Sequence, residues 1–235
     1  MAEAKRAPLQ KVMTAVGTFV WPKLNKPDQF KPNDPLKYSV KQRLSAEDSE
    51  ALIAKIEAAL KAYWPTAQAE LQKKIDEAKS GPDKAKAKKA LAEMKEADKP
   101  YKPAYDDEGN ETGEYEFNFK MNASFKGKDG KEKHIRPDIF DAAGKPMKVV
   151  PEIWGGTRGI VAGELNPFNM PIGVGIGLRL KAVQIIELRQ GGEGQRDAAA
   201  YGFGKQEGYE AEDEPSMDDH APADGESEAG GDEEF

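Results

Sequence analysis

The chain has 235 residues, of which 33% are charged and 38% hydrophobic, and its formal net charge is −7 at pH 7. It has no cysteine and only two histidines, His134 and His220, which excludes a disulfide framework, a thiolate metal site and a histidine cluster. No apolar run approaches the roughly 18 residues of a membrane span, and the segment MAEAKRAPLQ lacks the apolar core of a signal peptide.

The net charge conceals an uneven distribution along the chain. Residues 207–235 contain 13 Asp or Glu and no Lys or Arg, whereas residues 1–206 contain 35 Lys or Arg and 29 Asp or Glu. The positive excess lies in residues 1–43, with nine basic and three acidic residues, so residues 44–206 are neutral overall. A basic front with an acidic end is typical of a polyanion-binding protein that carries an acidic tail.

Two strands are predicted before residue 45. Residues 12–21, VMTAVGTFVW, are rich in β-branched and aromatic residues and predict a strand that ends at Pro22. Residues 22–35 contain four prolines and predict a loop. Residues 36–44 alternate, which predicts a half-buried strand with a basic outer face. The predicted inner side chains are Leu36, Tyr38, Val40 and Leu44, and the outer ones are Lys37, Ser39, Lys41 and Arg43.

Residues 45–99 change to a helical period. Ser45 is a predicted N-cap, and the apolar residues that follow are spaced as on one face of a helix. The pattern breaks at Gly81-Pro82 and then resumes, with few large apolar residues. We therefore expect a helical insertion that packs by one end and forms no second core.

Strand character returns at residues 115–125, YEFNFKMNASF, where Phe117, Phe119 and Phe125 alternate with polar residues and are predicted to lie in the core. Residues 127–132 predict a tight turn, and 133–141 a short edge strand. Two further strands are predicted, a glycine-interrupted one at 152–165 and a long one at 172–188.

This order of elements predicts a mainly β fold, an OB-fold-like five-stranded Greek-key barrel with a helical insertion at about 45–99. We expect residues 1–190 to form one domain, and residues 191–235 a disordered linker and acidic tail. Glycines inside the strands are expected where the barrel bends or where a ligand approaches the backbone.

The sequence carries no pattern of catalytic residues, and neither a metal nor another cofactor is predicted. GVGIG at 173–177 lacks the following helix that a phosphate-binding loop needs, so we interpret it as a strand. Asp106, Asp107 and Glu108 precede Gly109-Asn110, which favours a solvated loop over a metal site. The chain is therefore predicted not to be an enzyme.

Basic and aromatic residues are the candidates for binding. Lys37, Lys41 and Arg43 share the outer face of a strand within the basic front, although such a face can also be merely solvated. Trp154 and Phe168 lie in irregular, Gly- or Pro-flanked segments, where an aromatic ring either stacks on a nucleic-acid base or closes the end of the barrel.

Several segments together resemble the single-stranded DNA-binding proteins of short-tailed, podovirus-type bacteriophages. They are residues 117–135, 153–159 (IWGGTRG) and 165–188, together with the closing DEEF, and more loosely residues 16–28. The resemblance implies an OB-fold protein of phage DNA replication, recombination and repair, which also promotes strand annealing.

The same resemblance implies roles for individual residues. Lys120 matches a lysine of the family's DNA groove, Phe168 a stacking aromatic that is usually Tyr, and Arg158 a nearby basic position. Lys5 or Arg6 matches a basic N-terminal segment. Met170 stands where relatives can have an aromatic, which leaves the number of stacking positions open.

The resemblance also implies partners. It predicts that the tail contacts a phage DNA polymerase and helicase-primase and supports a homodimer, through residues Asp232, Glu233, Glu234 and Phe235. It places the protein in the cytoplasm of the infected bacterial host, away from membranes.

Sequence-independent binding of single-stranded DNA is therefore the predicted function, with the acidic tail competing with DNA and docking on partners. The alternative is an acidic-tailed protein-interaction or chaperone module that does not bind DNA.

Overall fold

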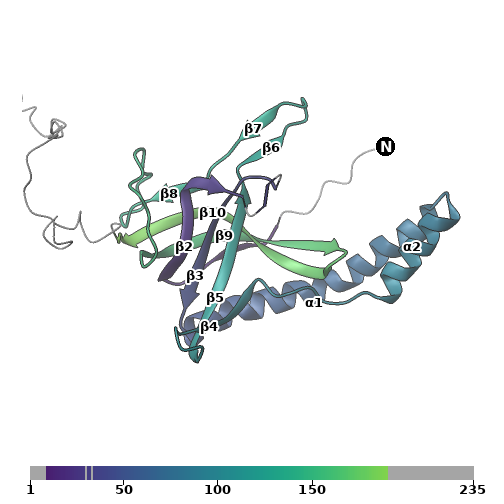
Figure 1. Cartoon of the computed structure of the whole chain (residues 1–235), viewed down its shortest axis with the longest axis horizontal. Helices are drawn as coiled ribbons and strands as arrows, with labels where there is room; N and C mark the ends of the chain where they lie inside the picture. Colours follow the sequence, from purple (N-terminus) through teal and green to yellow (C-terminus); the bar gives the residue numbers. More distant parts are fainter. Residues whose placement is uncertain (1–8, 30, 33, 190–235) are drawn as a thin grey trace, which may run out of the picture. The chain divides into compact units, whose positions relative to one another are not determined.

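The computed structural model describes residues 9–29, 31, 32 and 34–189. Ten strands and two helices follow one another along this part of the chain (Figure 1). In chain order they are β1 (Lys11–Met13), β2 (Gly17–Asp28), β3 (Lys37–Leu44), α1 (Ala46–Glu77), α2 (Gly81–Ala92), β4 (Tyr101–Tyr105), β5 (Glu111–Asn122), β6 (Ser124–Lys126), β7 (Glu132–His134), β8 (Asp138–Phe140), β9 (Arg158–Met170) and β10 (Gly173–Glu187).

Five of these strands close into a ring. Strand β9 pairs with β2, β2 with β3, β3 with β5, β5 with β10, and β10 again with β9. All of these pairings are antiparallel except β5–β10, which is parallel. This closed arrangement confirms the predicted OB-fold-like barrel, to which β1, β4 and β8 add at the sides.

The ring is closed at β2–β9 by only two residue pairs, Gly17 with Gly159 and Thr18 with Arg158. Gln42 of β3, which is fully buried, reinforces this short contact. Its Nε2 donates to the carbonyl oxygens of Ala15, at 3.0 Å, and Gly159, at 2.8 Å. The buried amide of Gln42 thus links β3 both to the residues just before β2 and to β9, the two segments that meet where the ring closes.

The core lies inside the ring. Phe117 and Phe119 of β5 are fully buried, as predicted, and pack in one cluster with Phe19, Val40 and residues of β9 and β10. Burying a phenylalanine side chain contributes about 1.5–3 kcal/mol. Alternation in β3 and β5 therefore places their apolar side chains inside and their polar side chains outside.

Gly163 of β9 makes room for one of these rings. A Cβ atom there would lie 2.7 Å from the carbonyl oxygen of Arg179 and 2.9 Å from Cε1 of Phe119. The glycine-interrupted pattern of this strand was predicted to serve bending or a ligand, but at Gly163 it serves the close approach of a core aromatic ring.

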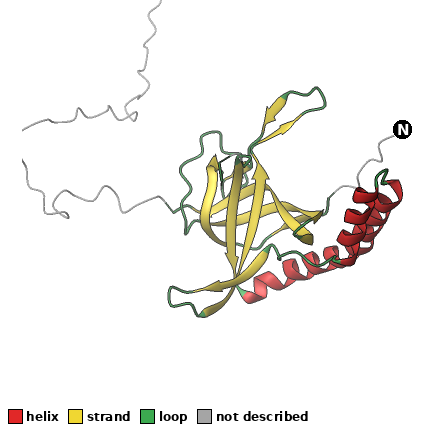
Figure 2. Cartoon of the chain, turned by 45° about the vertical axis from the view of Figure 1, so that its right-hand side comes forward, coloured by secondary structure: helices red, strands yellow, loops and turns green. Residues whose placement is uncertain are grey.

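Helix α1 begins as predicted, because the Ser45 side chain accepts the Asp48 backbone N–H at 3.1 Å. It contacts β5, β9 and β10, and four of its buried side chains belong to the core cluster: Leu52, Ile56, Leu60 and Ala67. Beyond them, Leu71 and Ile75 are also buried, while α2 has no buried residue. The helical insertion therefore packs on the barrel through the first part of α1, as predicted. Helix α2 folds back and packs against α1 (Figure 2).

The predicted helix break is displaced. The chain leaves α1 at Ala78, and Ser80 caps α2 by accepting the Asp83 backbone N–H. Gly81 and Pro82 form the first turn of α2, where the missing N–H of proline costs no helical hydrogen bond.

Three predictions in the front half of the chain were wrong. Residues 12–21 form two strands, and β2 continues to Asp28 through the segment predicted as a loop. Register shifts interrupt its pairing with β3 between Val20 and Lys23 and between Lys23 and Asp28. These intervals contain Pro22 and Pro27, which a strand tolerates at bulges. Leu36 lies just before β3 and is exposed.

Phe125 was wrongly assigned to the core and has 49% of its surface exposed. Strand β5 ends at Asn122, and Phe125 belongs to β6, which pairs only with β7 in a separate hairpin. This hairpin projects from the ring (Figure 2), so no second layer covers the Phe125 side chain. Strand β4 was not predicted at all, and β9 starts at Arg158 rather than at 152.

None of the described helices is both long and apolar enough to cross a membrane.

The two phenylalanines give a matched test of this packing. We expect Phe119→Ala to lower the free energy of unfolding by about 3–5 kcal/mol, because it empties a fully buried site. Phe125→Ala should change it by no more than about 0.5 kcal/mol, because the ring is half exposed. Urea unfolding of the two variants measures both values, and equal losses would contradict the core assignment.

Candidate nucleic-acid interface

The outer faces of β3 and β5 form a polar, mainly basic surface. Eight consecutive residue pairs join the two strands, and they place Ser39 opposite Lys120 and Lys41 opposite Asn118. Lys37 and Arg43 lie further along the same face of β3, opposite Asn122 and Glu116. The predicted alternation of β3 is therefore confirmed, and β5 supplies the neighbouring polar row.

A groove of about 400 Å³ lies on this surface, and we call it the lysine groove. Its basic lining residues are Lys23 of β2, Lys37 and Lys41 of β3, and Lys120 of β5. Trp21 of β2 lines it as well, with two acidic residues, Asp28 and Asp34. Lysine therefore outnumbers carboxylate in the groove by four to two.

A second groove, of about 660 Å³, adjoins the first, and we call it the Phe168 groove. Its lining includes the rings of Phe125 and Phe168 and the basic side chains of Arg179 and Lys181. Both grooves include Asn118 and Lys120. A cationic side chain is thus common to a lysine-rich groove and an aromatic one.

The ring of Phe168 has its position because residue 175 is glycine. The two residues are paired across β9 and β10. A Cβ atom at Gly175 would lie 2.6 Å from Cζ of Phe168, which is closer than real Cβ atoms come to other atoms. The glycine therefore gives the ring room to lie against the neighbouring strand.

Several predicted cations are already paired with acidic residues. Arg43 donates to Glu116 at 2.9 Å, and Arg158 donates to Glu187 at 2.9 Å. Lys41 is 3.9 Å from Glu116. In lysine and arginine these pairs leave further N–H donors for another anion.

Lys37 and Lys120 differ, because neither has an ion pair with any residue that the structure describes. The pKa of Lys120 is lowered from the ordinary value, first by partial burial and then by the positive charges of Lys37 and Lys41. The three lysines therefore repel one another on the surface of the sheet. An anion between them would remove that repulsion.

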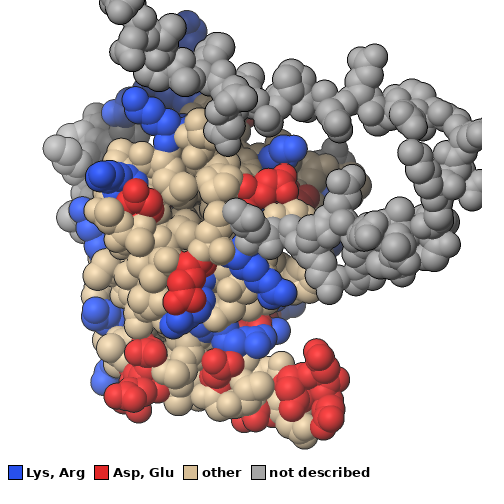
Figure 3. All heavy atoms as spheres, turned by 90° about the vertical axis from the view of Figure 1, so that its left-hand side faces the viewer, with Lys and Arg blue, Asp and Glu red and all other residues tan. Residues whose placement is uncertain are grey.

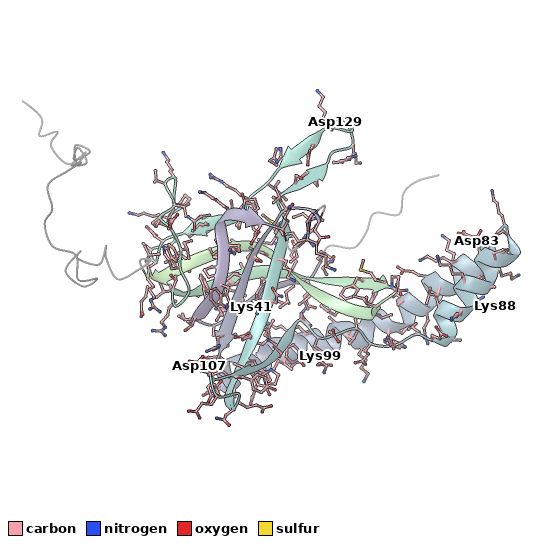
Figure 4. All side chains as sticks on the ribbon, viewed as in Figure 1. Lys41, Asp83, Lys88, Lys99, Asp107 and Asp129 are labelled. Atoms are coloured by element: carbon pink, nitrogen blue, oxygen red, sulfur yellow. The ribbon has the colours of Figure 1, made fainter. Side chains whose placement is uncertain are left out.

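The wider surface is of mixed charge. On the face drawn in Figure 3, basic side chains lie among acidic ones, and acidic side chains gather at the lower end. Figure 4 shows Lys41 over the strands of the ring, Asp107 at the β4–β5 end, and Asp129 far from Lys41 at the tip of the β6–β7 hairpin. Attraction of an anion to the lysine groove therefore depends on its own four lysines, which outnumber its two aspartates.

The structure brings only some of the predicted site residues together. Lys37, Lys41 and Lys120 share the lysine groove, and Phe168 lines the adjoining one. Arg43 is on the same face of β3, whereas Arg158 and Trp154 line neither groove. Trp154 has 47% of its surface exposed and lies before β9. The remaining predicted residues, Lys5, Arg6, Asp232, Glu233, Glu234 and Phe235, lie outside the described part of the chain.

Sequence reasoning missed Trp21, Lys23 and Arg179 as lining residues. The pair Trp21-Pro22 was interpreted as the end of a strand, although a proline inside β2 marks a bulge that turns the preceding side chain outward. Lys23 lies beyond the predicted end of that strand. Arg179 was assigned to the last strand, but nothing local indicated which groove that strand borders.

Within residues 9–29, 31, 32 and 34–189, no group of three or more acidic or imidazole side chains could hold a metal ion. Asp106 instead accepts hydrogen bonds from the backbone N–H groups of Glu108 and Asn110, at 3.0 and 2.8 Å. The backbone and side-chain N–H groups of Asn110, and to a smaller extent the backbone of Glu108, lower the pKa of the Asp106 carboxyl group. The same bonds fix the turn between β4 and β5.

Residues 19–188 match the family described as "Single-stranded DNA-binding protein, Bacteriophage T7". The chain belongs to this family. The match includes both grooves and all five strands of the ring apart from the start of β2, and it confirms the resemblance found in the sequence. The family's description names a binding function and no catalytic one.

Two curated relatives carry the same description. The single-stranded DNA-binding protein of Escherichia phage T7 is 39% identical over 116 residues, which are 47% of this chain and 49% of the relative. That of Enterobacteria phage T3 is 38% identical over 91 residues, or 37% of this chain and 39% of the relative. The chain thus spans half or less of the length of the curated relatives that it matches.

A solved structure matches over a larger part of the chain. The crystal structure of the single-stranded DNA-binding protein encoded by bacteriophage T7 superimposes with a TM-score of 0.61 and 25% sequence identity. The superposition covers 87% of this chain and all of that one. This chain therefore shares its overall fold with that protein.

The lysine cluster predicts an unusual effect on stability. We expect Lys120→Met to leave the free energy of unfolding unchanged or to raise it, because the variant removes a partly buried charge that two lysines repel. Lys128→Met, at the exposed turn of the β6–β7 hairpin, is the control and should have little effect. Thermal and urea unfolding measure both.

The pH dependence has a defined sign. Since the folded-state pKa of Lys120 is lowered, its protonated form destabilises the fold fully below that pKa, and the effect disappears as the pH rises through 10.5, the ordinary value. The difference between wild type and Lys120→Met should shrink in that range. A clear loss of stability in Lys120→Met at neutral pH would contradict the repulsion.

Proposed function

We propose that the chain binds single-stranded DNA without sequence preference. One observation carries this proposal: Lys120, without an ion pair among the described residues, is shared by a groove rich in lysine and a groove lined by the aromatic rings of Phe125 and Phe168. Lysines attract backbone phosphates, and aromatic rings stack on bases. Family membership supports the same chemistry.

Each site residue has a proposed role. Lys37, Lys41 and Lys120 contact phosphates in the lysine groove, and Phe168 stacks on a base in the adjoining groove. The other proposed DNA contacts are Arg43, Arg158, Trp154, Lys5 and Arg6. For Arg43 and Arg158 the contact uses the N–H donors left free by Glu116 and Glu187.

Binding of this kind is tolerant of sequence. A phosphate contact carries no sequence information, and every base offers a π-face to an aromatic ring. The lining of the two grooves is consistent with contacts of both kinds, since it combines lysine ammonium groups with aromatic rings.

The biological setting is part of the proposal. The protein serves replication, recombination and repair of phage DNA, with strand annealing, in the cytoplasm of the infected bacterial host. Residues 1–190 form the DNA-binding domain, and residues 191–235 form a linker and acidic tail. Through Asp232, Glu233, Glu234 and Phe235, the tail contacts a phage DNA polymerase and helicase-primase and supports a homodimer. The phage origin of the relatives and the acidity of the tail support this setting.

Salt titration of oligonucleotide binding tests the central claim. For wild type the logarithm of the binding constant should fall linearly with the logarithm of the salt concentration. Lys37→Gln and Lys120→Gln should each reduce the slope by about 0.7, and each should weaken binding about fivefold at roughly 0.1 M salt. Lys88→Gln on α2, far from Lys41 in Figure 4, is the matched control and should leave slope and affinity unchanged.

Two outcomes would defeat the proposal. One is a binding constant for wild type that does not depend on salt, and the other is equal affinity for single-stranded and duplex DNA. Binding to basic proteins but not to oligonucleotides, even after the tail is removed, would favour the interaction module instead.

Removal of residues 207–235 tests the role of the tail. The segment carries 13 acidic residues and, as a tethered competitor, has a high effective concentration at the lysine groove. Deletion should therefore tighten oligonucleotide binding on the order of tenfold at low salt, and the gain should fade as salt screens the charges. Unchanged oligonucleotide affinity after this deletion would count against competition between the tail and DNA.

Phe235→Ala keeps the charge of the tail and should leave DNA affinity nearly intact while weakening association with partners.

A further inference from the structure

Trp21 is the most exposed aromatic side chain in the described part of the chain, with 77% of its surface accessible. A large apolar side chain gains nothing for stability from such a position, because most of its surface stays in water. Phe19, two residues earlier in β2, is fully buried in the core. The alternation of β2 should therefore have placed residue 21 inside as well, and something turns it outward.

A bulge accounts for the reversal. Val20 pairs with Lys41 and Lys23 with Ser39, so three steps along β2 correspond to two steps along β3. The extra residue lies at Trp21-Pro22. The backbone of Trp21 has φ of 49°, and among the described residues it is the one non-glycine residue with a positive φ. That conformation is unfavourable for a bulky side chain, and such strain persists where a specific side-chain position is needed.

The strained position points the indole at the lysine groove. Trp21 lines that groove beside Lys37, Lys41 and Lys120. Lys23 also lines it but is paired with Asp28 at 3.5 Å. Lys41 is 3.9 Å from Glu116, whereas Lys37 and Lys120 have no ion pair with a described residue. An exposed ring beside these two ammonium groups suits a ligand that combines a flat, uncharged group with an anion. A nucleotide unit of a single strand is such a ligand.

We infer that Trp21 forms a second base-stacking position, distinct from that of Phe168, on which a base lies while the adjoining phosphate contacts Lys37 and Lys120. The inference rests on the proposed function and adds a subsite to it. Since Lys120 belongs to both grooves, the two rings are joined through one phosphate-binding side chain.

Three substitutions in the full-length protein test the subsite. Trp21→Gly should weaken binding of an oligothymidylate of about 16 nucleotides by about 5- to 100-fold, the range expected for one lost stacking contact. Trp21→Leu should weaken it similarly, because it keeps an apolar side chain without a π-face. Trp21→Phe should retain most of the affinity.

The same variants separate stacking from a structural role. Trp21→Gly should keep or raise the unfolding temperature, because glycine adopts a positive φ without strain. Its salt slope should equal that of wild type, since no charge is removed. An abasic oligonucleotide of equal length should bind wild type and Trp21→Gly equally. Tyr105→Ala, an exposed aromatic residue at the end of β4, is the control and should change none of these values.

The outcomes distinguish the inference from the proposed function. If Trp21→Gly binds oligothymidylate as wild type does while Lys120→Gln binds more weakly, the subsite is overturned and the proposed function stands. Equal losses on oligothymidylate and abasic strands would also overturn stacking. Unchanged DNA affinity with altered self-association would assign Trp21 to a protein contact instead. If wild type binds no oligonucleotide at all, the proposed function itself fails.

Discussion

The register between β3 and β5 is the constraint on which the rest of the structure depends. Eight consecutive pairs fix it, and Val40 and Phe119, which are paired, both point into the core. Because side chains alternate, the same register places Lys41 and Lys120 outside. A slip by one residue would expose the core phenylalanines and bury the lysines. The strand register that forms the barrel core therefore also brings the lysines of the groove together.

The sequence correctly predicted which side chains are buried in strands that have one face in the core and the other exposed to solvent. In β3 and β5 the alternation of apolar and polar residues identified both the core side chains and the outward lysines. It failed where the chain departs from that pattern. The bulge at Trp21-Pro22 reverses the expected side of the indole, and the separate β6–β7 hairpin leaves Phe125 without a layer to pack against. Such departures depend on strand pairing, which local composition does not reveal.

The candidate site was predictable in type but not in detail. The excess of basic residues in the first 43 positions indicated a basic surface. Lys37, Lys41 and Lys120 do lie together in the lysine groove. The sequence could not show that Arg43 and Arg158 are held by Glu116 and Glu187, because the carboxylates are 73 and 29 residues away along the chain. It could not show the isolation of Lys120 for the same reason. Which cations remain available to a ligand is decided by tertiary contacts.

The contact between Phe168 and Gly175 has a consequence for the evolution of this surface. Because a Cβ atom at residue 175 would overlap the ring as it lies, a substitution of the glycine and the position of the ring are linked. A homologue that replaces the glycine must also shrink or move the aromatic side chain, and one that keeps a large ring in this position must keep the glycine. The two residues, seven apart in the sequence, are therefore expected to change together where the ring keeps this position.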